Sequence, residues 1–201
     1  MPLISCNDFL DRNPQGSLTE DDAPGGSLEG KVFNVYYLMR SYNITAGIPA
    51  FAVHCFRSED TEKGSTASDG ADQSAFFDNF QYTTTNGVVG AYWTQNYTII
   101  YNCNSIITDI EASTNKTDES LINKAEAKFF RAYAYFNLVR AFGEVPLIDF
   151  KITDSSQANI AKSSIDKVYA LIDADLTEAT KVLPTTWSSA YTGRLTWGAA
   201  R

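Results

Sequence analysis

The sequence is poor in the residues that most often form metal sites and redox centres. Its 201 residues include one histidine, three cysteines and two methionines. Cys6, Cys55 and Cys103 form no CxxC or Cys/His spacing, so the sequence predicts no metal site and no cofactor. Cys55 and Cys103 either pack as small apolar groups, the interpretation we favour, or pair with each other in an oxidising compartment.

Basic residues and long apolar runs are also scarce. Lys and Arg number 16 against 24 Asp and Glu, which gives a formal net charge of −8. Binding to nucleic acid requires a basic patch, so this charge argues against a nucleic-acid partner. No apolar run approaches the roughly 18 residues that suggest a membrane-spanning helix. The sequence therefore predicts no segment that spans a bilayer.

Patterns that would indicate an enzyme are few. His54 lies in an apolar run, and we interpret it as a packed residue rather than a catalyst. Residues 113–116 fit the pattern S-x-x-K, but they fall in a polar loop and have no partner motif. The acidic residues at 59–62 could form a glycosidase pair, although a charge run in a loop is usually solvated. No Gly-rich phosphate loop follows a strand. We therefore predict that the chain is not an enzyme.

The strongest pattern lies at residues 125–148, AEAKFFRAYAYFNLVRAFGEVPLI. Apolar residues recur every three or four positions on two opposite sides, which predicts a helix buried between neighbours, with its charged residues in two polar seams. Gly143 is placed where a left-handed cap would end the helix, and Pro146 prevents its resumption. The two apolar rows are Ile122, Ala125, Phe129, Ala132, Phe136 and Val139, and Ala127, Phe130, Ala134, Leu138 and Ala141.

Further helices are predicted at residues 28–42, 89–110 and 165–183, and another begins at 195–201. Residues 48–56 are apolar but too short to assign. The middle of the 89–110 helix holds Asn104 at a core position, where its amide should bond the backbone of a neighbour. On the 165–183 helix we expect the acidic side chains to face solvent; these are Asp173, Asp175 and Glu178.

Helices that are apolar on both sides indicate a mainly all-α fold of stacked helical hairpins with long loops. The 34-residue spacing of Tyr101, Tyr135 and Tyr169 matches the period of tetratricopeptide repeats, although chance is a fair rival. The last predicted helix is cut short, so we expect a fragment of a larger helical domain. We divide the chain into a polar stalk, residues 1–27, and a helical domain, residues 28–201.

A long stretch rich in Ser, Thr, Asp and Gly occupies residues 57–87. A loop of this length within a compact domain is usually functional or disordered. Its aromatic residues indicate that part of it folds back and packs on the body; they are Phe76, Phe77, Phe80 and Tyr82.

The N-terminus has the form of a bacterial lipobox. Leu3, Ile4 and Ser5 precede Cys6 in the order apolar, variable, small and cysteine. The small residue fits the signal peptidase, and the thiol accepts the diacylglycerol. Either Cys6 is the site of lipid attachment, or it is an ordinary cysteine near a frayed terminus.

These features together resemble the SusD/RagB family of outer-membrane nutrient-binding lipoproteins. Beyond the lipobox and stalk, the sequence fits W-x3-Y-x2-I-x3-N at 93–104, E-A-x-F-x-R-A at 126–132, G-x-V-P-L at 143–147 and G-R-x-T at 193–196. The motif residues that we expect to hold the scaffold are Trp93, Asn104, Glu126, Arg131, Gly143 and Pro146.

The resemblance implies a cell-surface protein of the outer membrane, held there only by its lipid. Such proteins capture an oligosaccharide, for example a starch-like glycan, and cap the barrel of a TonB-dependent transporter. Family members are longer than this chain, which would then be their N-terminal part. The alternative is a helical-repeat scaffold that binds only protein partners.

Glycans are bound by aromatic faces that stack on sugar C–H groups and by amides and carboxylates that bond hydroxyls. The 57–87 stretch offers these groups, and its candidate ligand-binding residues are Asp78, Asn79, Gln81 and Tyr82. The alternative, which we favour for the aromatic residues, is that they only pin the loop to the body.

Overall fold

The computed structural model describes residues 26–64, 66 and 72–201. Its elements in chain order are α1 (Gly26–Met39), α2 (Ile48–Phe51), α3 (Asp72–Asp78), α4 (Gly87–Ala112), α5 (Asp118–Phe142), β1 (Val145–Pro146), β2 (Lys162–Ser163), α6 (Ile165–Val182) and α7 (Trp197–Ala200). Short π-helical turns occur at Tyr42–Ala46 and Ala52–Phe56, and 3-10 turns at Ser155–Ala158 and Ser189–Tyr191.

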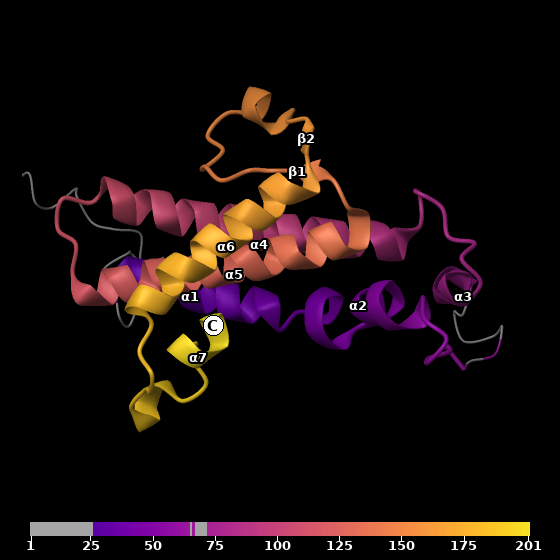
Figure 1. The fold of residues 1–201 in the computed structure, drawn as a ribbon, viewed down its shortest axis with the longest axis horizontal. Coiled ribbons are helices and arrows are strands. Elements are labelled where there is room, and N and C mark those ends of the chain that lie inside the picture. Colours follow the sequence, from indigo (N-terminus) through magenta and orange to yellow (C-terminus); the bar gives the residue numbers. More distant parts are fainter. Residues whose placement is uncertain (1–25, 65, 67–71) are drawn as a thin grey trace, which may run out of the picture.

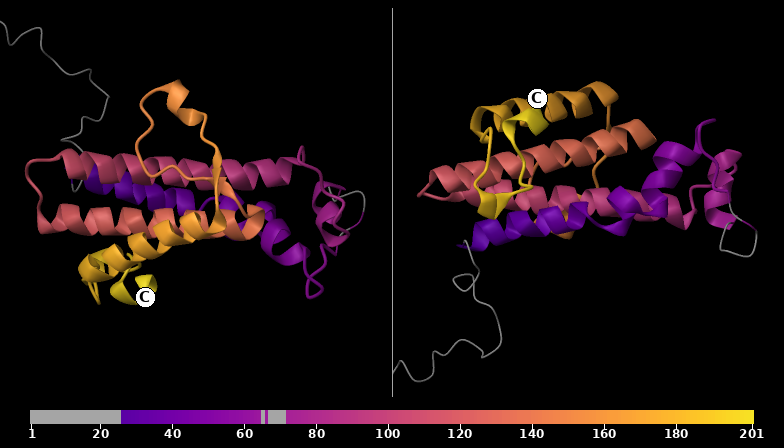
Figure 2. Two further views of the ribbon diagram at one scale, coloured as in Figure 1. Left: turned by 45° about the horizontal axis from the view of Figure 1, so that its top comes forward. Right: turned by 90° about the horizontal axis from the view of Figure 1, so that it is seen from below.

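The long helices form a layered bundle with α5 at its centre (Figures 1 and 2). α4 and α5 run antiparallel across a short loop, α6 crosses α5 on the other side, and α1 packs on α4 and α5. α3 lies at the end of the bundle away from the α4–α5 loop. The predicted all-α class is confirmed, whereas the tetratricopeptide-like detail stays a prediction.

Local sequence explains where α5 begins and ends. The side chain of Thr117 caps its N-terminus by accepting a hydrogen bond from the backbone N of Ser120 at 3.2 Å, and Asp118 and Glu119 fill its first turn. The helix ends at Gly143, which has φ 72° and ψ −118°. The predicted glycine stop is confirmed by the positive φ, although this ψ is not that of a left-handed helix.

The prediction that the charged residues of α5 lie in two polar seams holds for Arg140, which is exposed, but is wrong for three others. Glu126, Lys128 and Arg131 are all buried, because α1, α4 and α6 surround this part of the helix. Phe136, from one predicted apolar row, is instead 37% exposed. The row that contains Phe130 is buried as predicted, and it packs in the main core.

α6 also departs from its prediction at one position. Asp173 and Glu178 are exposed as expected, but Asp175 is 1% exposed and faces α5. A helical pattern cannot reveal this, because a buried carboxylate is tolerated only where a partner charge lies on another element.

The connection after α5 forms a small antiparallel pair of strands. Val145 pairs with Ser163 and Pro146 with Lys162. Pro146 is tolerated because each strand of a two-stranded sheet has a free edge.

The unassigned 48–56 segment is helical, since α2 continues into the π-helical turn Ala52–Phe56. Cys55 and Cys103 are free thiols in the described residues. Cys103 is fully buried, and burial raises the pKa of its thiol. Cys6 lies outside the described residues, as does most of the predicted stalk. Within the described residues, no helix is both long and apolar enough to cross a membrane.

Candidate functional site

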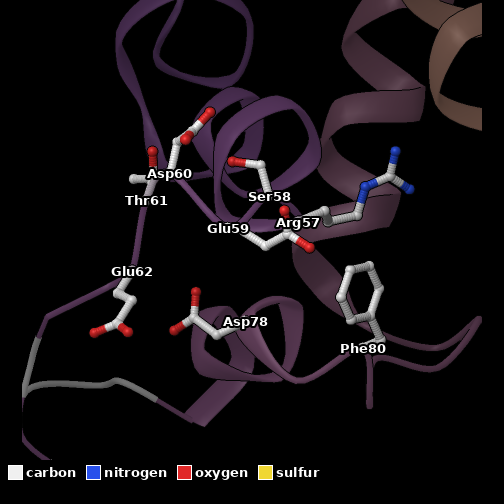
Figure 3. Close-up of a pocket in the computed structure, with 8 residues that line it drawn as sticks. All are labelled: Arg57, Ser58, Glu59, Asp60, Thr61, Glu62, Asp78 and Phe80. Atoms are coloured by element: carbon white, nitrogen blue, oxygen red, sulfur yellow. The ribbon is translucent and has the colours of Figure 1, made fainter.

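A cleft of about 440 Å³ opens at the α3 end of the bundle. Its walls come from two segments, residues 57–62 after the π-helical turn and residues 78–80 at the end of α3 (Figure 3). Asp78 ties them together, because its Oδ2 accepts a hydrogen bond from the backbone N of Lys63 at 3.2 Å. The lining residues are Arg57, Ser58, Glu59, Asp60, Thr61, Glu62, Asp78 and Phe80.

Phe80 is the aromatic residue of the cleft, and its backbone is strained. Its φ is 58°, the only positive φ of a non-glycine residue in the described chain. Its N–H donates to Phe77 O at 3.3 Å, while Gln81 N–H donates to Phe76 O at 2.8 Å. These two bonds form a Schellman motif with Phe80 at the position that glycine usually occupies. The motif leaves the Phe80 side chain 65% exposed beside the acidic side chains (Figure 3).

The cleft is anchored to the core through Arg57 and Tyr82. Arg57 Nη1 donates to the Tyr82 hydroxyl at 3.1 Å, and the Tyr82 ring stacks on Phe77 with centroids 4.5 Å apart. Phe77 is 1% exposed. The Nε of Arg57 is buried and, among the described residues, has no hydrogen-bond partner. Arg57 also lines an apolar cavity of about 230 Å³ on the other side of the loop.

His54 lies near this anchor and packs as the sequence predicted. Its Nε2 is 2.5 Å from the Tyr92 hydroxyl, and the two rings meet edge to face. Burial lowers the pKa of His54, and the nearby cations Arg140 and Arg57 lower it further. Burial likewise raises the pKa of the Tyr92 hydroxyl.

The four predicted ligand-binding residues are placed differently. Asp78 lines the cleft, and Tyr82 lines the adjoining apolar cavity. Asn79 and Gln81 are exposed and line neither; Asn79 Oδ1 accepts from the backbone N of Gln81 at 3.2 Å. Whether any of the four binds a ligand stays a prediction.

Sequence reasoning placed two lining residues in other roles. Phe80 was expected to pack, but of the loop aromatics only Phe77 and Tyr82 reach the core. Arg57 marked only the start of the loop. The signal that could have revealed Phe80 is the order of residues 76–80. The short helix ends at Asp78, so Phe80 falls on the turn that follows it.

Two of the predicted scaffold residues meet in one buried network. Asn104 Nδ2 donates to Ile148 O at 2.8 Å, so its predicted bond to a neighbouring backbone is confirmed. Asn104 Oδ1 accepts from Arg131 Nη1 at 2.8 Å, and Arg131 binds the carboxylate of Asp175. Burial alone would lower the pKa of Arg131, but the hydrogen bonds and charge of Asp175 raise it.

Glu126 belongs to a second network, built around Arg194. Arg194 donates from Nε and Nη2 to the two carboxylate oxygens of Glu126, at 3.1 and 2.6 Å. It also donates to Glu29 at 2.6 Å and to Asn123 at 3.0 Å. The guanidinium lies 4.3 Å from the centroid of the Trp187 ring. This network joins α1, α5 and the loop before α7.

Trp93 and Pro146 take part in contacts that stabilise the N-terminal part of α4. The Trp93 ring meets Phe142 edge to face with centroids 5.0 Å apart, and Tyr97 lies beside it. The Tyr97 hydroxyl donates to Pro146 O at 2.8 Å. These contacts are structural. In the described part of the chain, no cluster of His, Cys, Asp or Glu is arranged to hold a metal.

The chain is similar to known proteins in both sequence and fold. The chain is 32% identical over 191 residues to SusD-like protein P2 of Formosa agariphila, covering 92% of this chain and 37% of that protein. A laminarin-binding SusD-like protein of known structure has a TM-score of 0.73 at 30% identity, covering 86% of this chain and 37% of its own. A SusD-like protein from Bacteroides fragilis has a TM-score of 0.72 at 24% identity, covering 92% and 36%.

The chain therefore spans just over a third of the length of each of these three relatives. A SusD-like family model, described as "Starch-binding associating with outer membrane", matches residues 8–201, nearly the whole chain. The chain belongs to the SusD-like family.

Proposed function

We propose that the chain is part of a surface protein that binds an oligosaccharide in the cleft at the α3 end. The observation that carries this proposal is Phe80, an aromatic residue held in a strained, exposed conformation beside polar side chains. Strained residues cluster at functional sites, where the surrounding structure maintains them. An exposed aromatic face has the chemistry to stack on the C–H groups of a pyranose.

The remaining lining residues suit the rest of a sugar. Carboxylates accept hydrogen bonds from hydroxyl groups, and the hydroxyl of Thr61 can both donate and accept them. The Ser58 hydroxyl donates to Cys55 O at 2.7 Å and can accept a bond from a sugar. A similar protein of known structure binds laminarin, a glucan, and the family description names starch. These names support a glycan as ligand.

We further propose that the protein is lipid-anchored through Cys6 at the outer membrane and delivers its ligand to a TonB-dependent transporter. The lipobox and the description of the family support the location. The family resemblance supports the transporter as the partner that receives the ligand.

A scaffold that binds only protein is the second candidate. It is favoured by an apolar groove of about 340 Å³ between α5 and α6. Phe136, Tyr133 and Tyr169 line this groove and are more than a third exposed. Such a surface suits a protein partner.

Isothermal titration of the full chain against starch and laminarin oligosaccharides tests the proposal. We expect saturable heat with at least one glycan. No heat with any glycan, together with capture of a barrel partner, would favour the scaffold. Incorporation of radiolabelled palmitate tests the anchor: labelling that persists in Cys6→Ala would rule out lipid attachment at Cys6.

A further inference from the structure

The cleft has an unbalanced charge. Four of its lining residues are acidic, Glu59, Asp60, Glu62 and Asp78, while Arg57 is the one cation among them. The lining therefore carries three more negative than positive formal charges, since four minus one is three. Counting Lys63, the next residue along the chain, still leaves an excess of two.

Arg57, the one cation of the cleft lining, already has a hydrogen-bond partner outside that lining. Arg57 Nη1 donates to the Tyr82 hydroxyl, which holds the guanidinium toward the apolar cavity behind the loop. The acidic side chains, by contrast, lie on both walls: Glu59, Asp60 and Glu62 on one segment and Asp78 on the other (Figure 3). An anionic ligand entering the cleft would meet carboxylates on both sides.

Resting on the proposed glycan function, we infer that this cleft selects uncharged oligosaccharides and rejects acidic ones that carry uronate or sulfate groups. Ionised carboxylates are acceptors only, so they bind the hydroxyl donors of a neutral sugar. They repel a carboxylate or sulfate at the same distance. The same carboxylates therefore favour the binding of a neutral sugar and disfavour the binding of an anionic one.

Rejection by charge depends on the salt concentration, whereas exclusion by shape does not. Exposed charges interact over a Debye length of about 8 Å at physiological salt, and this length shortens as salt is added. Rejection of acidic glycans should therefore weaken at high ionic strength, whereas binding of neutral glycans should change little. A cleft that excluded the acidic sugar by its size would discriminate equally at all salt concentrations.

The test is titration calorimetry on the full chain with matched ligands. Maltoheptaose and a laminarin oligosaccharide are each compared with the same glycan oxidised at C6, which converts neutral sugars into uronates on an unchanged backbone. The measurements are made at low and high salt. The variant Glu59→Gln/Asp60→Asn/Glu62→Gln removes three charges and leaves Asp78, which supports the loop.

A control variant removes three charges elsewhere. Glu111→Gln/Asp118→Asn/Glu119→Gln changes the end of α4 and the start of α5, at the other end of the bundle (Figure 1). It has the same net charge as the cleft variant, so it separates a local effect from one of overall charge.

We expect the wild type and the control to bind the oxidised glycan about tenfold or more weakly than the neutral one at low salt. The cleft variant should lose most of this difference and still bind the neutral glycan. Equal or tighter binding of the oxidised glycan by the wild type would overturn the inference, as would a preference that the cleft variant retains. Absence of binding to neutral and oxidised glycans alike would instead overturn the proposed function.

Discussion

Arg131 and Asp175 form a two-pronged ion pair that joins α5 to α6. Arg131 Nε donates to Oδ2 at 2.7 Å and Nη2 donates to Oδ1 at 2.8 Å, with both side chains almost fully buried. The remaining Nη1 bonds Asn104 on α4. One guanidinium therefore sets the relative positions of three helices, which a lysine could not do with a single ammonium group.

We predict that Asp175→Leu lowers the free energy of unfolding by about 3–5 kcal/mol, because Arg131 keeps its charge in a buried position without its partner. The double variant Arg131→Met/Asp175→Leu should be more stable than the two single losses imply, since neither charge is then left unpaired. Urea denaturation of the four proteins measures the coupling. Additive losses would contradict the buried ion pair.

We predict that Arg194→Lys destabilises the fold by about 2–3 kcal/mol, because lysine cannot bond Glu29, Glu126 and Asn123 together. The near-ultraviolet circular dichroism of the protein should also change, since the Arg194 guanidinium lies on the Trp187 ring. Arg40→Lys, at an exposed position, is the matched control and should leave the melting temperature unchanged.

We predict that stability decreases as the pH falls below about 6.5, the pKa of histidine in an unfolded chain. Burial and two nearby arginines lower the pKa of His54 in the native state, so the unfolded chain binds a proton that the native chain resists. His54 is the one histidine of the sequence. Urea midpoints measured between about pH 7.5 and 5.5 should fall in the wild type and fall less in His54→Gln. An equal change of the urea midpoint with pH in the wild type and in His54→Gln would contradict the role of His54.

We predict that Phe80→Gly weakens glycan binding about tenfold or more and does not destabilise the fold. Glycine adopts the positive φ of this position without strain, which should leave stability unchanged or raise it by up to about 1 kcal/mol. Phe76→Ala removes a neighbouring exposed aromatic residue that does not line the cleft, and it should bind normally. If Phe80→Gly and the wild type bind the glycan with equal affinity, Phe80 does not contribute to binding.

Most of the helical framework could be predicted from the sequence. The period of apolar residues located α1, α4, α5 and α6, and Gly143 marked the end of α5, because these signals are local. The burial of Glu126, Arg131 and Asp175 could not be predicted in this way. Their oppositely charged partners lie 44 or more positions away in the chain, and a charged residue gives the same helical pattern whether it faces solvent or a distant partner.

The candidate site was predicted only in part. Composition identified the 57–87 stretch and Asp78 within it. The exposed position of Phe80 depends on a Schellman motif with phenylalanine where glycine is usual, and sequence preferences argue against that geometry. The cleft itself arises where two segments meet through Lys63 and Asp78, which are 15 positions apart in the chain, so it depends on a tertiary contact.

The Arg194 network joins residues that are synthesised far apart in time. Glu29 is made 165 residues and Glu126 68 residues before Arg194. At roughly 5–20 residues per second, Glu29 waits on the order of ten to thirty seconds for its partner. Until then, closing α1 onto α5 would bury two carboxylates without the guanidinium that balances their charge. We therefore expect the bundle to close fully only after the residue-194 loop has left the ribosome.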